Sequence, residues 1–122
     1  VTNVDRTPRN PNLLVWHDRL WLIDHGAALY RHHDQDAWPS DAARRPFPQI
    51  RDHVLLPFAG SVAEAGERLA PRLDEATLEA IVGAVPESWL APGARRAYVD
   101  HLLERLATRA FEREAEEVRR GA

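Results

Sequence analysis

The order of apolar and polar positions divides the chain into a polar loop, a β-hairpin and a helical remainder. Residues 1–12 are mostly polar and include two prolines and three asparagines, so a loop is expected there. The apolar runs LLVW (13–16) and LWLI (20–23) follow, and the three polar residues between them predict an antiparallel hairpin. Residues 24–26, Asp-His-Gly, close the second run, where glycine gives the backbone freedom to turn.

The middle of the chain is expected to be less regular. The stretch AALYRHH (27–33) predicts a short helical turn. Residues 34–48 contain three prolines among polar residues, which predicts an irregular surface loop. The stretch QIRDHVLLPFA (49–59) predicts a helix that is interrupted near Pro57.

Three further helices are expected after residue 60. Ser61 and Glu64 form an S-x-x-E capping box, and the apolar residues after it recur with helical spacing. Asp74 is expected to cap the next helix, whose apolar stripe consists of Leu78, Ile81, Val82 and Val85. The last helix is expected to begin near Pro92 and to end near residue 118, with an apolar stripe formed by Tyr98, Leu102, Leu106 and Ala110 and flanked by Val99 and Leu103.

These elements predict a mainly α fold class with a small β-hairpin. A chain of 122 residues has room for one domain with one moderate core. We therefore treat residues 1–122 as a single domain made of a motif-bearing segment (1–33), a surface loop (34–48) and a helical part (49–122).

Composition narrows the possible functions. All 16 basic residues are arginine, so a reaction that needs an amine must obtain it from elsewhere, and the bias towards arginine and alanine suggests a GC-rich bacterial genome. The net charge of −3 argues against direct nucleic-acid binding, for which a basic excess is expected. The chain lacks cysteine, a signal-peptide pattern and an apolar run of the ~20 residues that span a bilayer, so a cytoplasmic protein without membrane contact is expected.

Three oxygen-bearing side chains are expected to converge at one end of the hairpin. Asp5 and Asn10 lie on the loop before the first strand, and Asp24 directly follows the second. An antiparallel hairpin returns the chain to its starting end, which would bring Asp24 beside that loop. Carboxylate and amide oxygens are ligands that Mg²⁺ prefers, and a neighbouring carboxylate can accept a proton from a hydroxyl group.

The spacing of these residues matches the catalytic elements of kinases. Kinases use an Asp as catalytic base, an Asn five residues later as a Mg²⁺ ligand, and an Asp-x-Gly carboxylate as a second ligand. DRTPRN (5–10) matches the first pattern, and DHG (24–26) matches the second one hairpin later. The reaction predicted from them is transfer of the γ-phosphoryl group of ATP to a hydroxyl.

The stretch NVDRTPRN (3–10), continued by PNLLVWHDRLWLIDHGAALY, resembles the HipA-like kinases in the N-x-D-x-x-x-x-N arrangement that begins at Asn3. The resemblance covers residues 1–33, while residues 49–122 agree only in being helical. It implies a kinase-like C-lobe in which Asp5 is the catalytic base, Asn10 and Asp24 hold Mg²⁺, ATP is the cosubstrate, and a protein serine or threonine is the expected acceptor.

The same resemblance implies that half of the active site lies outside this sequence. The chain has no glycine-rich loop before Asp5 and no lysine to hold the ATP phosphates. Because it also begins abruptly at Val1, we expect it to be the C-terminal piece of a longer protein whose N-lobe is the missing partner. By itself it is expected to bind nucleotide poorly and to transfer nothing.

Other side chains in the segment allow two interpretations. Arg6 and Arg9 lie near enough to contact a phosphate, although either could instead brace the loop. His25 is expected to pack or to bond to the catalytic loop, and Asn12 to cap the turn into the strand.

Three alternative functions remain open. The first is a non-catalytic helical interaction module, in which Asp5 and Asn10 only make turn hydrogen bonds. The second is a lipid or small-molecule kinase. The third is a zinc site built from His32, His33 and Asp34 or from His17 and His25, which the absence of cysteine and of H-x-x-x-H spacing disfavours.

Overall fold

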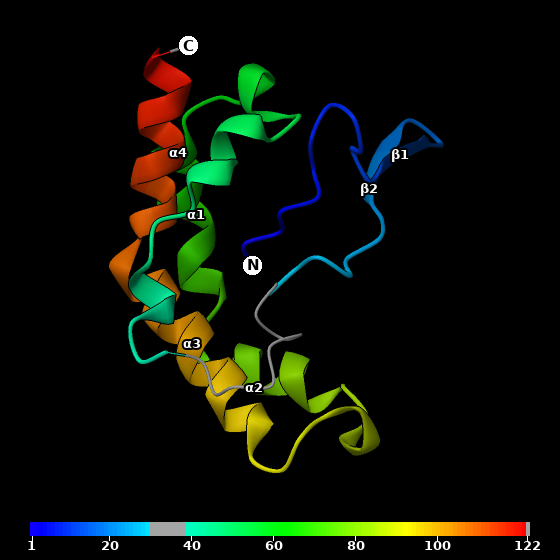
Figure 1. The fold of residues 1–122 in the computed structure, drawn as a ribbon, viewed down its shortest axis with the longest axis vertical. Helices are drawn as coiled ribbons and strands as arrows, with labels where there is room; N and C mark the ends of the chain where they lie inside the picture. The colour runs from blue at the N-terminus through cyan, green and yellow to red at the C-terminus, as the bar shows by residue number, and fades with distance from the viewer. Residues whose placement is uncertain (30–38, 122) are drawn as a thin grey trace.

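The N-terminal loop leads into a two-stranded antiparallel hairpin that projects to one side of the helices (Figure 1). The structure, a computed structural model, describes residues 1–29 and 39–121. Strand β1 (Leu13–Trp16) pairs with β2 (Arg19–Leu22), and the register places Leu14 opposite Trp21. The predicted hairpin is confirmed, in agreement with the predicted mainly α class with a small β component.

The turn of the hairpin is tighter than the sequence suggested. Arg19 belongs to β2, so two residues rather than three connect the strands. His17 and Asp18 both have positive φ angles, 48° and 55°, as a type I′ turn requires. This turn matches the right-handed twist of the strands, which explains why a two-residue connection is used although neither residue is glycine.

The hairpin leaves much of its apolar surface exposed. Val15 and Leu20 lie on one face and Leu14 and Trp21 on the other, because successive side chains alternate across a strand. Between 45% and 71% of each of these four side chains is exposed. An isolated two-stranded hairpin is at best marginally stable, so this element gains little from the rest of the described fold.

The described residues contain four α-helices: α1 (Val62–Leu69), α2 (Glu75–Gly83), α3 (Ala94–Thr108) and α4 (Ala110–Gly121). The two predicted helix caps are confirmed. The Ser61 hydroxyl accepts a hydrogen bond from the Glu64 N–H at 3.2 Å, and the Asp74 carboxylate accepts one from the Thr77 N–H at 2.8 Å. None of the helices in the described ranges is both long and apolar enough for a bilayer span.

Two predictions for the middle of the chain were wrong. Residues 49–59 form no α-helix but two short 3₁₀ turns, Pro48–Asp52 and Leu56–Phe58, separated by extended backbone at His53. The supposed surface loop contains a third turn, Ala42–Arg44, and Ala42 and Ala43 are buried. Prolines near the start of the first two turns favour short elements, and the small alanines of the third allow close packing against α3. Residues 30–38, which complete the predicted turn (27–33) and loop (34–48), lie outside the described residues.

The long C-terminal helix was also predicted incorrectly, because it divides at Arg109. This residue adopts the left-handed conformation (φ 51°) and separates α3 from α4. No glycine or proline marks the break in the sequence. The break allows α3 to pack on α2 while α4 packs on α1, so tertiary contacts override the local helical preference.

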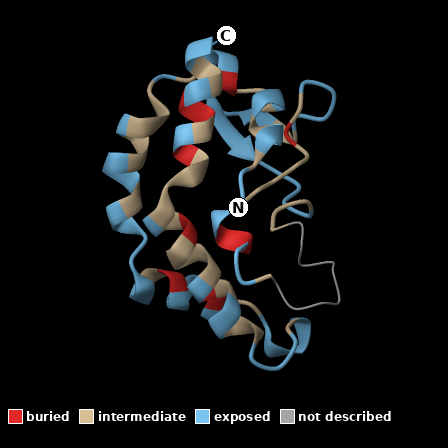
Figure 2. Ribbon diagram, turned by 60° about the vertical axis from the view of Figure 1, so that its left-hand side comes forward, coloured by how far each residue is buried: buried red, intermediate tan, exposed pale blue. Residues whose placement is uncertain are grey.

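The apolar core is small and lies between α2 and α3. Leu78, Val82 and Val99 are buried, and the partly buried residues packed against them are Tyr98, Leu102, Leu103 and Leu106. The apolar stripe predicted for α2 is wrong at Ile81, because this residue is 54% exposed and does not face the core. In Figure 2 the buried residues are spread along the helices and the turn that packs on them, whereas the hairpin is largely exposed.

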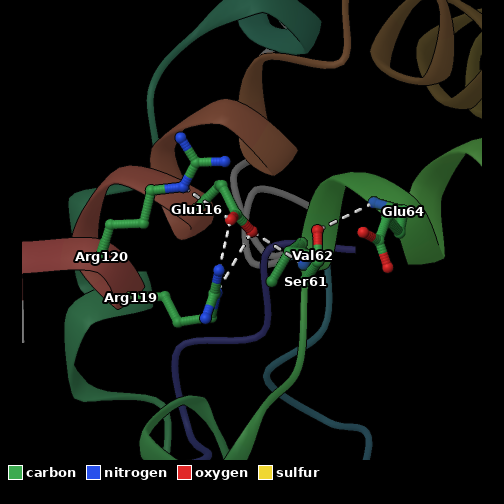
Figure 3. A network of polar contacts seen from close by, with 6 residues as sticks. All are labelled: Ser61, Val62, Glu64, Glu116, Arg119 and Arg120. Carbon is green, nitrogen blue, oxygen red and sulfur yellow. Dashed lines mark hydrogen bonds and ion pairs between the residues drawn. The ribbon is translucent and has the colours of Figure 1, made fainter.

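Buried charges join α1 to α4 where apolar contact is sparse. The Glu116 carboxylate accepts a hydrogen bond from the Val62 N–H at 2.8 Å and forms ion pairs with Arg119 and Arg120 at 2.5 and 2.9 Å (Figure 3). The Val62 N–H is one of the first amides of α1, which have no acceptor within the helix. Glu116 therefore caps α1 from another helix, and the Arg119 guanidinium is the main cause that lowers its pKa to about 2.

Another acidic residue of α4 sets how closely α1 can approach. The Glu112 carboxylate is buried and pairs with Arg109 at 2.9 Å. A Cβ atom on Gly66 would overlap that carboxylate, so a larger residue at this position would require the Glu112 side chain to move.

We predict that Glu116→Gln lowers the melting temperature at pH 7 and that this difference disappears in acid. The wild-type carboxylate has a pKa of about 2 in the fold against an ordinary value of 4.5, so its stabilising effect is complete above pH 4.5 and is lost as the pH falls to about 2. Melting curves of both proteins between pH 2 and pH 7 test this. Glu117→Gln, at an exposed neighbouring position, is the control. A Glu116→Gln deficit that is the same at every pH would contradict the assignment.

Candidate active site

The candidate site begins with a direct contact between Asp5 and Asn10. The Asn10 side-chain amide donates a hydrogen bond to Asp5 Oδ1 at 2.7 Å. Backbone hydrogen bonds in both directions between Thr7 and Asn10 close the loop between the two residues. The loop thus brings together the first two of the three residues that the sequence singled out.

This contact fixes the orientation of the Asn10 amide. An ionised carboxylate can only accept hydrogen bonds, so Asn10 must present its NH₂ group to Asp5. Its carbonyl oxygen is then left available as a ligand, and Asn10 itself is exposed. Amide oxygens are suitable ligands for Mg²⁺, so the donor chemistry of this residue fits the expected cation.

Asn12 also holds Asp5, which the sequence did not predict. Its side-chain amide donates to the Asp5 backbone carbonyl at 2.9 Å and to Asp5 Oδ2 at 3.2 Å. Asn3 Oδ1 accepts a hydrogen bond from the Asp5 N–H at 2.9 Å. The Asp5 carboxylate is therefore oriented on both of its oxygens. The three asparagines within ten positions were the only sign of this arrangement in the sequence.

Arg6 connects the loop to the end of the hairpin. Its guanidinium donates to the carbonyl of Asn12 at 2.6 Å, to the carbonyl of Ile23 at 3.3 Å and to His25 Nδ1 at 3.0 Å. The side chain is only 7% exposed. Of the two interpretations of Arg6, phosphate contact or bracing of the loop, these contacts favour bracing. His25 bonds to Arg6 of the loop, which is one of the two contacts that the sequence suggested for it.

The backbone of Arg6 also contacts the helical part of the chain. Its carbonyl accepts a hydrogen bond from the Val54 N–H at 2.8 Å. Burial, with a smaller contribution from the Arg6 charge, lowers the pKa of the neighbouring His53. Arg6 therefore links three segments: the loop, the end of β2 and the 3₁₀ region.

Asp24 lies at the same end of the hairpin but is not bonded to Asp5 or Asn10. The hydrogen bonds of the described residues link it to the loop only through its neighbours Ile23 and His25, which contact Arg6. Its side chain is exposed, and Oδ1 accepts a hydrogen bond from the Gly26 N–H at 3.4 Å. Asp24 has a left-handed backbone (φ 49°), a conformation that aspartate and asparagine tolerate better than most residues.

The remaining candidates take no part in this network. Arg9 is exposed on the loop. His32, His33 and Asp34 of the zinc alternative lie outside the described residues. Within residues 1–29 and 39–121, no group of three histidine, aspartate or glutamate side chains is placed to hold a metal.

Comparison with known proteins adds no relative. No family model, curated protein or solved structure matches the chain. The functional interpretation therefore depends on the residues and on their geometry.

We predict that Arg6→Met destabilises the protein by about 2 kcal/mol, because two backbone carbonyls lose a charged hydrogen-bond donor. The same variant should speed the hydrogen exchange of the Ile23 and Val54 amides, which bond to Asn12 and to Arg6 itself. Denaturant unfolding and amide exchange measured by NMR provide the test. Arg9→Met, on the same loop but exposed, should change stability by less than about 0.5 kcal/mol. Equal effects of the two substitutions would show that Arg6 does not brace the loop.

Proposed function

We propose that this chain is the C-terminal lobe of an ATP- and Mg²⁺-dependent kinase of the HipA-like type, acting in the cytoplasm. The observation that carries the proposal is the Asp5 carboxylate, held by the amides of Asn10 and Asn12 within a D-x-x-x-x-N loop. The supporting observation is Arg6, which ties the Asp-x-Gly segment to that loop.

In the proposed reaction Asp5 is the catalytic base. A hydroxyl of a protein serine or threonine attacks the γ-phosphorus of ATP, and its proton passes to the Asp5 carboxylate. The new oxygen–phosphorus bond forms as the bond to the oxygen that bridges the β- and γ-phosphorus breaks, and ADP leaves. The two asparagine amides orient the carboxylate before the acceptor arrives, which reduces the reorganisation needed in the transition state.

Asn10 and Asp24 are the residues that would hold Mg²⁺. Asn10 offers an amide oxygen, and Asp24 offers an exposed carboxylate next to a glycine. When bound, the cation neutralises charge on the ATP phosphates. Arg9 is exposed on the same loop and is our candidate for a phosphate contact, whereas the Arg6 guanidinium is already bonded within the protein.

The proposal includes a second lobe that supplies what this chain lacks. There is no lysine in the sequence and no glycine-rich loop before Asp5 to hold the nucleotide. The hairpin also exposes large apolar side chains on both faces, among them Val15 at 71% and Trp16 at 58%. An N-lobe packed on the hairpin would cover this surface and bring ATP to Asp5.

A non-catalytic interaction module is the second candidate function. The exposed hairpin favours it as well, because an uncovered apolar patch is typical of a binding surface. The two candidates differ in what the natural full-length protein contains. An upstream segment with a glycine-rich loop and a lysine would support the kinase, and the absence of such a segment from the gene and its neighbours would support the module.

We predict that Asp5→Asn in the full-length protein lowers phosphoryl transfer by about 10²–10⁴-fold, the usual contribution of a general base.

Asp24→Asn should raise the Mg²⁺ concentration that the reaction needs and leave the fold intact, because the side chain is exposed and asparagine accepts the left-handed backbone. Transfer from γ-labelled ATP to protein and small-molecule acceptors, at several Mg²⁺ concentrations, measures both effects.

The matched control for these variants is Asp18→Asn, which changes an exposed aspartate in the hairpin turn. It should transfer phosphate like the wild type. Full activity of Asp5→Asn would remove Asp5 from the mechanism. Label on small molecules or lipids but on no protein would replace the protein-kinase assignment with the small-molecule one.

A further inference from the structure

A cavity of about 210 Å³ lies between the start of the chain, the segment 42–49 and α3. It is separate from the candidate active site, because none of Asp5, Asn10 and Asp24 lines it. Apolar side chains form part of its wall, among them Val4, Leu29 and Phe47. Its polar groups include Arg45, His101 and Arg105.

Arg105 is the unusual member of this wall. It is a cation with only 4% of its surface exposed. Its Nη1 atom donates to the carbonyls of Ala43 and Arg45 at 3.2 and 3.4 Å, and its guanidinium carbon lies 5.7 Å from the centre of the Phe111 ring. Within residues 1–29 and 39–121, the hydrogen bonds of Arg105 are made by Nη1. A guanidinium has five N–H donors, so Nε and Nη2 keep donors for a further acceptor.

The charges around the cavity favour an anion. Arg45 and Arg105 contribute two cations, of which Arg45 pairs with the exposed Asp41 at 2.9 Å. The negative charge of Glu114 also acts on Arg105. The Glu114 carboxylate has a hydrogen-bond partner elsewhere, because it accepts from the Phe47 N–H at 2.5 Å. Burial and the Arg105 charge lower the pKa of His101 to about 4, so the imidazole is neutral at pH 7 and the cations that line the cavity are Arg45 and Arg105. The Val1 amino group lies near Arg105, and burial and the Arg105 charge lower its pKa.

We propose that this cavity binds a small organic anion, whose carboxylate or phosphate is accepted by Arg105 and whose apolar part packs against Val4, Leu29 and Phe47. The guanidinium fork matches the planar or tetrahedral oxygens of such groups. The volume is below the ~300 Å³ at which pockets for drug-sized ligands begin, which limits the ligand to a small metabolite or a single side chain. This site does not depend on the proposed kinase function.

Calorimetric titration of the full-length protein with benzoate, benzamide and inorganic phosphate tests the site. Benzoate and benzamide have the same shape and differ in charge, so we expect saturable benzoate binding and at least about tenfold weaker benzamide binding. Phosphate binding with a similar dependence on Arg105 would extend the ligand class to phosphates, and its absence would restrict the class to carboxylates. Equal binding of benzoate and benzamide, or no saturable binding of either anion, would overturn the proposal.

Two variants locate the binding. Arg105→Gln removes the cation and should abolish anion binding. Ala42→Leu keeps Arg105 but fills the cavity that residue 42 lines, so it should block benzoate even if Arg105→Gln fails to fold. Arg113→Gln, at an exposed position of α4, is the control and should bind like the wild type. Benzoate binding that survives Ala42→Leu would place the anion elsewhere and overturn the proposal.

Discussion

The N-terminal third of the fold depends on one buried cation. Among the described residues, every buried apolar side chain comes from residue 42 or later, so the loop and the hairpin have no apolar core of their own. Arg6 takes that role by bonding to Asn12, Ile23 and His25 through its side chain and to Val54 through its backbone. Its guanidinium donates to two backbone carbonyls, and the one on Asn12 also accepts a hydrogen bond from the Ile23 N–H. Together with the backbone hydrogen bond from Ile23 to Asn12, this side chain holds the loop beside the segment that contains Asp24.

In the helical part, too, buried charged side chains hold segments together, but here they are carboxylates. Glu112 and Glu116 are buried on α4, and both face α1, where one meets Gly66 and the other caps Val62. A chain that is 29% charged and contains few large apolar residues in its C-terminal helix has little else to bury there. Arginines three residues away in the sequence pair with these carboxylates, so the cost of burying them is offset locally.

The sequence predicted those parts of the fold that local rules determine. The hairpin followed from two apolar runs, and the helix caps at Ser61 and Asp74 followed from side chains that can accept a hydrogen bond from the backbone. The break at Arg109, the short turns at 48–58 and the burial of Ala42 depend on contacts between distant segments, which periodicity does not encode. Ile81 was misplaced for the same reason, because helical spacing does not show how wide a face the neighbouring helix covers.

For the candidate site, the D-x-x-x-x-N pattern and the hairpin predicted that Asp5, Asn10 and Asp24 converge. The hydrogen bonds of the described residues join Asp5 to Asn10 but not Asp24 to either. The second amide on Asp5, from Asn12, was missed because the sequence does not say which way a turn side chain points. The kinase assignment itself remains a proposal, and the geometry supplies its support in the hydrogen bonds that orient Asp5.

The hairpin has a further consequence for the behaviour of the chain in solution. In its two-stranded sheet both strands are edges, each with outward N–H and C=O groups that have no partner strand within the sheet. Combined with apolar side chains on both faces, such a ribbon is a template for pairing between molecules and hence for aggregation. A partner that covered the hairpin would therefore also prevent such pairing between copies of this chain.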